Sequence, residues 1–84
     1  MNAIQEAKQL YSEYRFALSI PNAPLGEAKD HIAKQLAMRE VESKIVENES
    51  ILAMAKIHMD ARAVMVLDAR IFFLRNVKEE IQKL

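Results

Sequence analysis

Apolar residues recur along the chain at the three- and four-residue spacings of amphipathic helices. Near the N-terminus, positions with 3-4-3-4 spacing share one helix face: Ile4, Ala7, Tyr11, Tyr14 and Leu18. Asn2 is followed three residues later by Gln5, which is the spacing of a capping box with Asn in place of Ser or Thr. The pattern predicts a first helix over about residues 3–18, with Tyr11 and Tyr14 on its apolar seam.

The segment from residue 19 to residue 26 interrupts this periodicity. It holds both prolines of the chain, Pro21 and Pro24, and its only glycine, Gly26. Proline disfavours helical geometry in the residue before it, and Pro24 suits the first position of a following helix. One glycine cannot build the backbone cradle of a phosphate-binding loop. We therefore predict a plain connection between two helices.

From residue 27 to residue 84 there is neither proline nor glycine, and a single helix of that length would measure roughly 87 Å. The apolar residues, however, follow two different registers. The first, with Asn48 in one of its places, contains Met38, Val41, Ile45, Leu52, Ala55 and Met59. The second contains Val64, Leu67, Ile71, Leu74 and Ile81. We therefore predict two antiparallel helices over about 27–47 and 50–83, separated at the polar run 47–50, where Asn48 or Ser50 could cap. A break near Asp60, or an unbroken helix with a stutter, is the alternative.

The stretch from residue 51 to residue 74 is the richest in large apolar side chains. As one helix it is apolar on every side, which is typical of a helix enclosed by neighbours. A membrane does not suit it, because each charge near a bilayer centre costs about 2.5–3.5 kcal/mol and five lie inside it: Lys56, Asp60, Arg62, Asp68 and Arg70. A β-hairpin turning at residues 68–70 is the rival, but Asp-Ala-Arg lacks the Gly or Asn of a tight turn.

We expect this stretch and the tyrosine seam to be buried in an oligomeric helical bundle, because a chain this small gains from sharing its core with a copy. The expected interface residues are Tyr11, Tyr14, Val64, Leu67, Ile71, Phe72 and Phe73. A second set is expected to form ion pairs with another helix, a second subunit or a ligand: His58, Asp60, Arg62, Asp68 and Arg70. The repeated Asp-Ala-Arg at 60–62 and 68–70 suits reciprocal pairing across a two-fold axis, although solvated rim charges explain it equally well.

Composition narrows the function without naming it. The 84 residues suit one domain, and 12 basic residues balance 12 acidic ones, which removes the usual electrostatic argument for nucleic-acid binding. The chain has no cysteine, so disulfide and thiolate chemistry is excluded. Its first residues lack the apolar run of a secretory signal. We therefore expect a cytoplasmic protein, which includes a viral or mobile-element protein in a host cytosol.

Candidate catalytic and metal-binding patterns are weak. His31 lies one turn after Glu27, but a catalytic zinc site needs three protein ligands. Met54 and His58 have the soft ligand types that copper prefers, yet Met more commonly fills irregular gaps in helical cores. No Gly-x-Ser-x-Gly motif occurs. No catalytic residue, metal or cofactor is predicted, and an enzyme is not favoured.

The sequence thus predicts an all-α chain of three helices, one short and two long, that forms an oligomeric bundle. Its predicted function is that of a protein–protein interaction or regulatory module that associates with itself and with another protein. One alternative is a small-molecule or anion binder with Arg62, Arg70 and His58 at the subunit interface, since guanidinium groups bind carboxylate and phosphate in a fork geometry. The other alternative, a nucleic-acid-associated regulator, is disfavoured by the zero net charge.

Overall fold

The computed structural model describes residues 2–18 and 27–84 of the chain. These residues form three α-helices and no strand: α1 (Ala3–Ala17), α2 (Glu27–Ile57) and α3 (Ala61–Lys83). The predicted all-α class with one short and two long helices is therefore confirmed, and the rival β-hairpin is wrong. The predicted connection at 19–26 lies outside the described residues.

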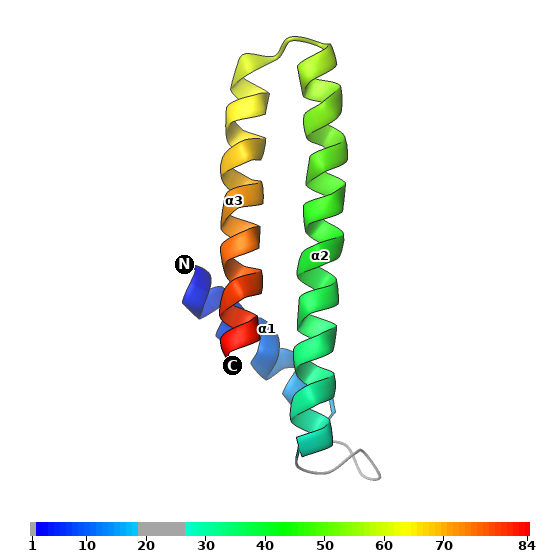
Figure 1. Ribbon diagram of the computed structural model, residues 1–84, viewed down its shortest axis with the longest axis vertical. Helices are drawn as coiled ribbons and strands as arrows, with labels where there is room; N and C mark the ends of the chain where they lie inside the picture. The colour runs from blue at the N-terminus through cyan, green and yellow to red at the C-terminus, as the bar shows by residue number, and fades with distance from the viewer. Residues whose placement is uncertain (1, 19–26) are drawn as a thin grey trace.

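The helices α2 and α3 form a long antiparallel hairpin, and α1 lies obliquely across one side of it (Figure 1). The molecule measures 51 × 21 × 15 Å. At 1.5 Å per residue, α2 is roughly 46 Å long and α1 only about 22 Å. The short helix therefore covers only the open end of the hairpin, which is the end away from the α2–α3 turn. The half nearest the turn, here called the arm, consists of two helices (Figure 1).

Helix α1 begins with the capping box that its sequence indicates. The backbone N–H of Gln5 donates to Asn2 Oδ1 at 2.8 Å, and the backbone N–H of Asn2 donates to Gln5 Oε1 at 3.1 Å. These bonds satisfy two donors that the first turn of a helix otherwise leaves unpaired. The helix ends at Ala17, against a predicted end at about residue 18.

The predicted separation at residues 47–50 is wrong, because α2 continues through them to Ile57. Asn48 does not cap a new helix. Its side chain is buried, and its Nδ2 donates to the backbone oxygen of Lys44 at 2.7 Å, one turn earlier in the same helix. The polar run therefore meets its hydrogen-bonding needs inside a continuous helix.

The chain instead reverses at residues 58–60, close to the alternative break at Asp60. Met59 has a φ of 56°, in the left-handed region. The N–H of Met59 donates to the Lys56 oxygen at 3.1 Å, and the N–H of Asp60 donates to the Ala55 oxygen at 3.0 Å. These two bonds are those of a Schellman motif, with Met59 in the place that glycine usually takes. Asp60 then starts α3, because its Oδ1 accepts from the N–H of Ala63 at 3.0 Å.

The hydrophobic core lies at the open end, where all three helices meet. Each helix contributes two buried side chains: Ala7, Leu10, Ala37, Val41, Val77 and Ile81. Ala7 and Ala37 are fully buried and have no atoms beyond Cβ, so α1 can lie close to α2. In the arm, Ala55, Leu67 and Ile71 are buried on the facing registers of α2 and α3.

The prediction that the apolar stretch 51–74 forms one helix is wrong. The stretch comprises the end of α2, the turn and the first half of α3. Its side chains therefore do not surround a single axis. Leu67 and Ile71 are buried, whereas Ile57 and Met65 are among the most exposed large apolar side chains of the described residues. The reversal at residues 58–60 places one part of the stretch against the other and leaves the remainder at the surface.

Candidate interaction surfaces

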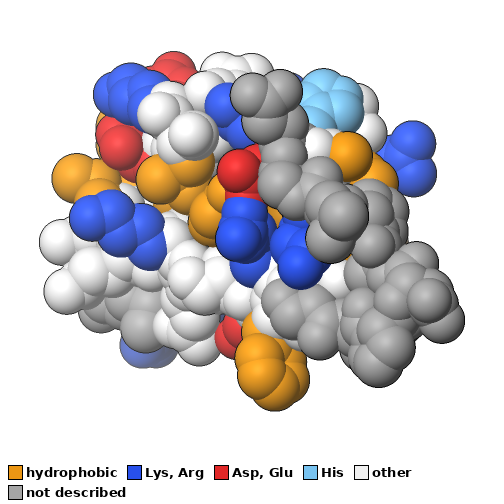
Figure 2. All heavy atoms as spheres, turned by 90° about the horizontal axis from the view of Figure 1, so that it is seen from below, with side chains coloured by type: hydrophobic (Ala, Val, Ile, Leu, Met, Phe, Trp, Pro, Cys, Tyr) orange, Lys and Arg blue, Asp and Glu red, His pale blue; other side chains and the backbone are white. Residues whose placement is uncertain are grey.

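The hairpin has one side that carries α1 and an opposite side, here called the open face. Val41 and Val77 belong to the cluster that α1 covers. Glu42 and Lys78 directly follow them in the sequence, so each of these side chains is rotated by about 100° around its helix axis from the covered side. Lys78 Nζ lies 3.1 Å from Glu42 Oε1, so this ion pair joins α2 to α3 on the open face. Seen from the open end, side chains of both charges surround exposed hydrophobic ones (Figure 2).

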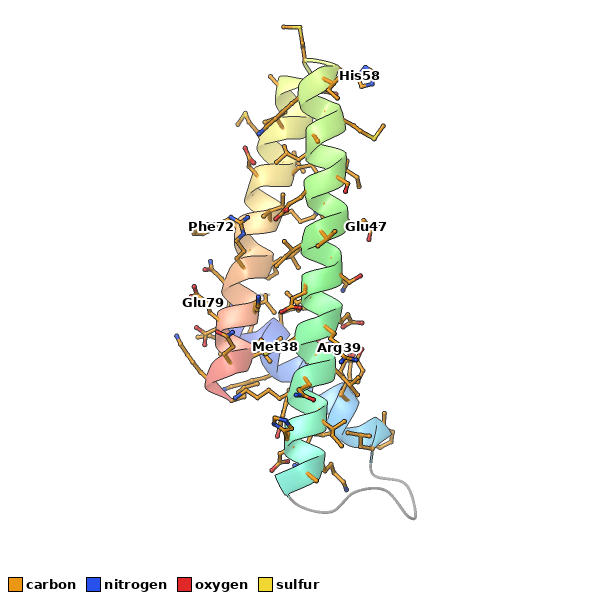
Figure 3. The ribbon with its side chains drawn as sticks, turned by 45° about the vertical axis from the view of Figure 1, so that its right-hand side comes forward. Met38, Arg39, Glu47, His58, Phe72 and Glu79 are labelled. Carbon is orange, nitrogen blue, oxygen red and sulfur yellow. The ribbon has the colours of Figure 1, made fainter. Side chains whose placement is uncertain are left out.

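Large apolar side chains are exposed along the open face and its edges. The exposed fractions are 63% for Val46, 77% for Ile57, 72% for Met65 and 69% for Phe72. Val46 and Ile57 are eleven residues apart on α2, and Met65 and Phe72 are one heptad apart on α3, so each pair shares one side of its helix. Figure 3 shows Phe72 pointing away from α2. Singly scattered apolar residues are ordinary, but two aligned stripes on neighbouring helices are typical of an interaction surface.

Two grooves between α2 and α3 open onto this face. The groove nearer the open end has a volume of about 530 Å³ and is lined by Glu42, Ile45, Val46, Arg75, Lys78, Glu79 and Gln82. The groove at the turn has a volume of about 430 Å³ and is lined by Lys56, Met59, Ala61, Val64 and Met65. The first has a charged rim over an apolar floor, and the second is almost wholly apolar. Both are shapes that side chains of another helix could fill.

The ion pairs across the open face are exposed and belong to opposite helices. Arg75 donates through Nη2 to Glu49 Oε1 at 3.2 Å, and Lys78 pairs with Glu42. Exposed pairs of this kind contribute little to stability, about 0–1 kcal/mol each. They do place both signs of charge beside the groove.

The five predicted interface residues on α3 differ in how deeply they are buried. Leu67 and Ile71 are buried inside the single chain, so they stabilise the hairpin itself. Phe73 is half-buried against the three-helix core, and Val64 is half-buried beside the turn groove. Of these five α3 residues, Phe72 has an exposed side chain.

The two tyrosines of α1 make contacts within the chain. The Tyr11 hydroxyl donates to Asp30 Oδ1 at 3.1 Å, and the same carboxylate forms an ion pair with Arg15. Tyr14 is half-buried against the core. Burial raises the pKa of the Tyr14 hydroxyl above its usual value, and the negative charges of Glu40 and Glu13 and a hydrogen bond to Glu40 raise it further. The tyrosine seam therefore attaches α1 to α2.

Glu40 has one buried carboxylate oxygen, Oε2, that accepts no hydrogen bond from any described residue. It lies beside Tyr14, at the junction of α1 and α2. A buried acceptor without a donor destabilises the state that buries it. The contact between α1 and α2 therefore leaves one buried hydrogen-bond acceptor unpaired among the described residues.

The predicted ion-pair residues are mostly exposed. Asp60 is the N-cap of α3, which gives its carboxylate a partner within the chain. His58, Arg62, Asp68 and Arg70 are exposed and form no ion pair with another described residue. Arg62 and Asp68 are six residues apart, which turns them about 120° from one another on α3. Pairing between subunits by these residues stays a prediction.

Sequence reasoning missed Val46 as a candidate contact residue, and it included Ile57 and Met65 only as part of the stretch 51–74, not among the named interface residues. Each falls outside the dominant apolar registers, so each was obscured by the residues that fill the hairpin seam. A signal was present in the heptad spacing of Val46 and Ala53, followed four residues later by Ile57.

Within the described helices, no group of three His, Asp or Glu side chains is arranged to hold a metal ion. None of these helices combines the length and apolar character that crossing a bilayer requires. Comparison of the chain with protein-family models, curated proteins and solved structures found no match.

Proposed function

We propose that this protein is a helical protein–protein interaction module that self-associates through the open face. The observation that carries this proposal is the set of large apolar side chains, each more than half exposed, on Val46, Ile57, Met65 and Phe72. Val46 lines the groove nearer the open end and Met65 lines the groove at the turn, and side chains of a second helical hairpin could fill both. Two hairpins that meet in this way would form a four-helix bundle with both α1 helices on its outer sides.

The energy of burying these side chains is of the right size for a reversible contact. Full burial of one large apolar side chain contributes about 1.5–3 kcal/mol. At exposed fractions of 63–77%, each would recover roughly 1–2 kcal/mol, or about 8–16 kcal/mol over two copies. Association costs about 4–15 kcal/mol in lost freedom. Because the two ranges overlap, we expect the dimer to form and dissociate with protein concentration.

The charge of the open face supports a second copy as the occupant. Glu42 and Glu49 on α2 lie beside Lys78 and Arg75 on α3, so both signs are present across the width of the face. A two-fold contact brings the same patch of both subunits together. A patch of mixed sign can meet itself with opposite charges opposed, whereas a patch of one sign would repel its copy.

The anion-binding alternative has less support. Its three residues, Arg62, Arg70 and His58, are exposed and do not line either groove of the open face. Exposed cations without a cavity give little shape selection for a small molecule. The geometry therefore favours a protein partner over a small ligand.

Sedimentation velocity over a concentration series from about 1 μM to about 1 mM tests the proposal. We expect the wild type to dimerise within this range and Phe72→Asp to weaken dimerisation at least about tenfold, because a carboxylate replaces an apolar group at the contact. Phe16→Asp is the matched control, since Phe16 is 82% exposed but belongs to α1. Wild type that stays monomeric throughout, or equal effects of both variants, would refute the proposal.

A further inference from the structure

The ion pairs of the open face show which positions of α2 and α3 lie at the same level along the hairpin. Arg75 Nη2 on α3 lies 3.2 Å from Glu49 Oε1 on α2, so these two residues are level. Lys56 follows Glu49 by one heptad, and Asp68 precedes Arg75 by one heptad. Because α2 and α3 are antiparallel, both steps run about 10.5 Å towards the turn (Figure 1). Lys56 and Asp68 are therefore level as well.

Lys56 and Asp68 both belong to the open face and have no partner there. A step of one heptad keeps a residue on nearly the same side of its helix, so Lys56 shares the side of Glu49, and Asp68 shares the side of Arg75. Lys56 also lines the turn groove, which opens onto this face. Both side chains are exposed, and neither forms an ion pair with another described residue.

The open face therefore carries charges at three levels, and at each level α2 and α3 have opposite signs. Glu42 is level with Lys78, since Glu42 Oε1 and Lys78 Nζ lie 3.1 Å apart. From the open end to the turn, the order is Glu42, Glu49 and Lys56 on α2, and Lys78, Arg75 and Asp68 on α3. The signs are thus negative, negative and positive on α2, and positive, positive and negative on α3.

A two-fold contact between two open faces has two arrangements. In the parallel one, the axis runs along the hairpin, both turns lie at the same end, and α2 of each copy faces α3 of the other. In the antiparallel one, the axis crosses the hairpin, and α2 faces α2. The parallel arrangement opposes unlike charges at all three levels. The antiparallel arrangement, centred on the same levels, opposes Glu49 to Glu49 and Arg75 to Arg75, which is repulsive.

The exposed apolar side chains near the turn agree with the parallel arrangement. Ile57 directly follows Lys56, and Met65 lines the turn groove together with Lys56. Ile57 and Met65 are therefore at about the same level on opposite helices. When α2 of one copy faces α3 of the other, these two side chains, which are 77% and 72% exposed in the single chain, would cover one another reciprocally.

We propose that the dimer is parallel and that Lys56 of each copy pairs with Asp68 of the other copy. This inference rests on the proposed self-association through the open face, and it names α3 of a second copy as the surface that α2 binds. The pair is incomplete in a single chain, because neither group has an ion-pair partner among the described residues. Exposed pairs stabilise weakly, but unlike charges at every level select one arrangement over the other.

Two charge reversals, Lys56→Glu and Asp68→Lys, test the pairing. In a parallel dimer, either variant alone opposes like charges twice, whereas one copy of each variant opposes unlike charges twice. By sedimentation velocity, we expect each variant alone to dimerise about fivefold or more weakly than the wild type, and their equimolar mixture to recover wild-type dimerisation. The recovery should shrink as salt rises. Pairing within one chain would give no recovery on mixing, because each chain would keep its own like charges.

Arg70→Glu is the matched control for the charge reversals. Arg70 is exposed and lies in the arm, but it is two residues from Asp68, which turns it about 160° away on α3. We expect Arg70→Glu to dimerise as the wild type does and to give no recovery when mixed with Asp68→Lys. All three substituted side chains are exposed, so circular dichroism should show that the variants stay folded.

Cross-linking tests the orientation directly, because the chain has no cysteine of its own. Met59 is 89% exposed at the turn, and Gln82 is exposed at the open end. With a bifunctional maleimide, we expect Met59→Cys to cross-link with itself. An equimolar mixture of Met59→Cys and Gln82→Cys should give few cross-links between the two variants.

The outcomes separate this inference from the proposed function. If the wild type dimerises and Phe72→Asp weakens the dimer, but the mixed charge variants show no recovery, only the parallel pairing is overturned. Preferential cross-links between Met59→Cys and Gln82→Cys would likewise overturn it in favour of the antiparallel dimer. A wild type that stays monomeric throughout the concentration series would overturn both the pairing and the self-association.

Discussion

Replacing Met59 with glycine should stabilise the protein. Met59 holds the left-handed position of the Schellman motif that ends α2, with a φ of 56°. A non-glycine residue there costs about 1–2 kcal/mol because its Cβ approaches the following carbonyl oxygen. The side chain is 89% exposed, so its removal forfeits almost no burial. Against this gain, glycine adds roughly 0.5–1 kcal/mol of backbone entropy to the unfolded chain.

The net effect of Met59→Gly is therefore an increase of about 0.5–1 kcal/mol in the free energy of unfolding. For a domain of this size, that corresponds to a rise in Tm of roughly 2–8 °C. Urea denaturation followed by circular dichroism should show a higher midpoint with an unchanged m-value. Wild type and variant must be compared at one protein concentration, because self-association would raise the apparent stability of both.

Met59→Ala is the control for this prediction. Alanine keeps the Cβ and therefore keeps the cost of the left-handed conformation, so we expect a change of less than about 0.5 kcal/mol. The reasoning is refuted if glycine lowers the midpoint, or if alanine and glycine raise it equally. Either result would mean that the chain does not reverse through a left-handed residue at this position.

Three further substitutions test the helix cap, the attachment of α1 and the core. Asp60→Ala should lower the free energy of unfolding by about 1 kcal/mol in urea denaturation, because the N–H of Ala63 loses its acceptor; Asp60→Ser, which retains an acceptor, should recover most of the loss. In Tyr14→Phe, stability should fall less steeply above pH 10 than in the wild type. The raised pKa of folded Tyr14 means that the stability due to its neutral hydroxyl is complete below the unfolded value of 10.0 and is lost as the pH rises through the folded pKa; identical pH profiles of thermal stability would contradict this. Ile81→Ala should destabilise the protein by about 2–5 kcal/mol, since Ile81 is fully buried, whereas Phe16→Ala should change stability by less than about 0.5 kcal/mol; a similar loss in both would place Ile81 outside the core.

The all-α class and the start of α1 could be predicted from the sequence because they depend on interactions between residues close together in the chain. A capping box needs only Asn2 and Gln5 at the correct spacing, and both hydrogen bonds form within one turn. Likewise, the heptad positions Val41, Asn48 and Ala55 are all buried, because a helix that lies along a neighbour must bury one register.

The position of the α2–α3 turn could not be predicted from local sequence. The polar run at 47–50 resembles a helix boundary, but the hydrogen bond from Asn48 to Lys44 keeps it helical. The real reversal at 58–60 lacks the glycine or proline that marks most turns, and it depends on a methionine with a positive φ. The packing of α2 against α3 offsets the cost of that conformation, and no local sequence pattern reports such packing.

Helical periodicity and composition are enough to specify that this chain is helical, that its core is aliphatic and that its apolar residues exceed what one register can bury. The tertiary structure decided which of them stay exposed. Val46 and Phe72 are exposed because α1 packs on the other side of the hairpin, and Ile51 and Val66 are partly exposed because α1 is too short to reach the arm. Helical periodicity states which residues share a side, but which sides receive a neighbour depends on the lengths and crossing positions of all three helices.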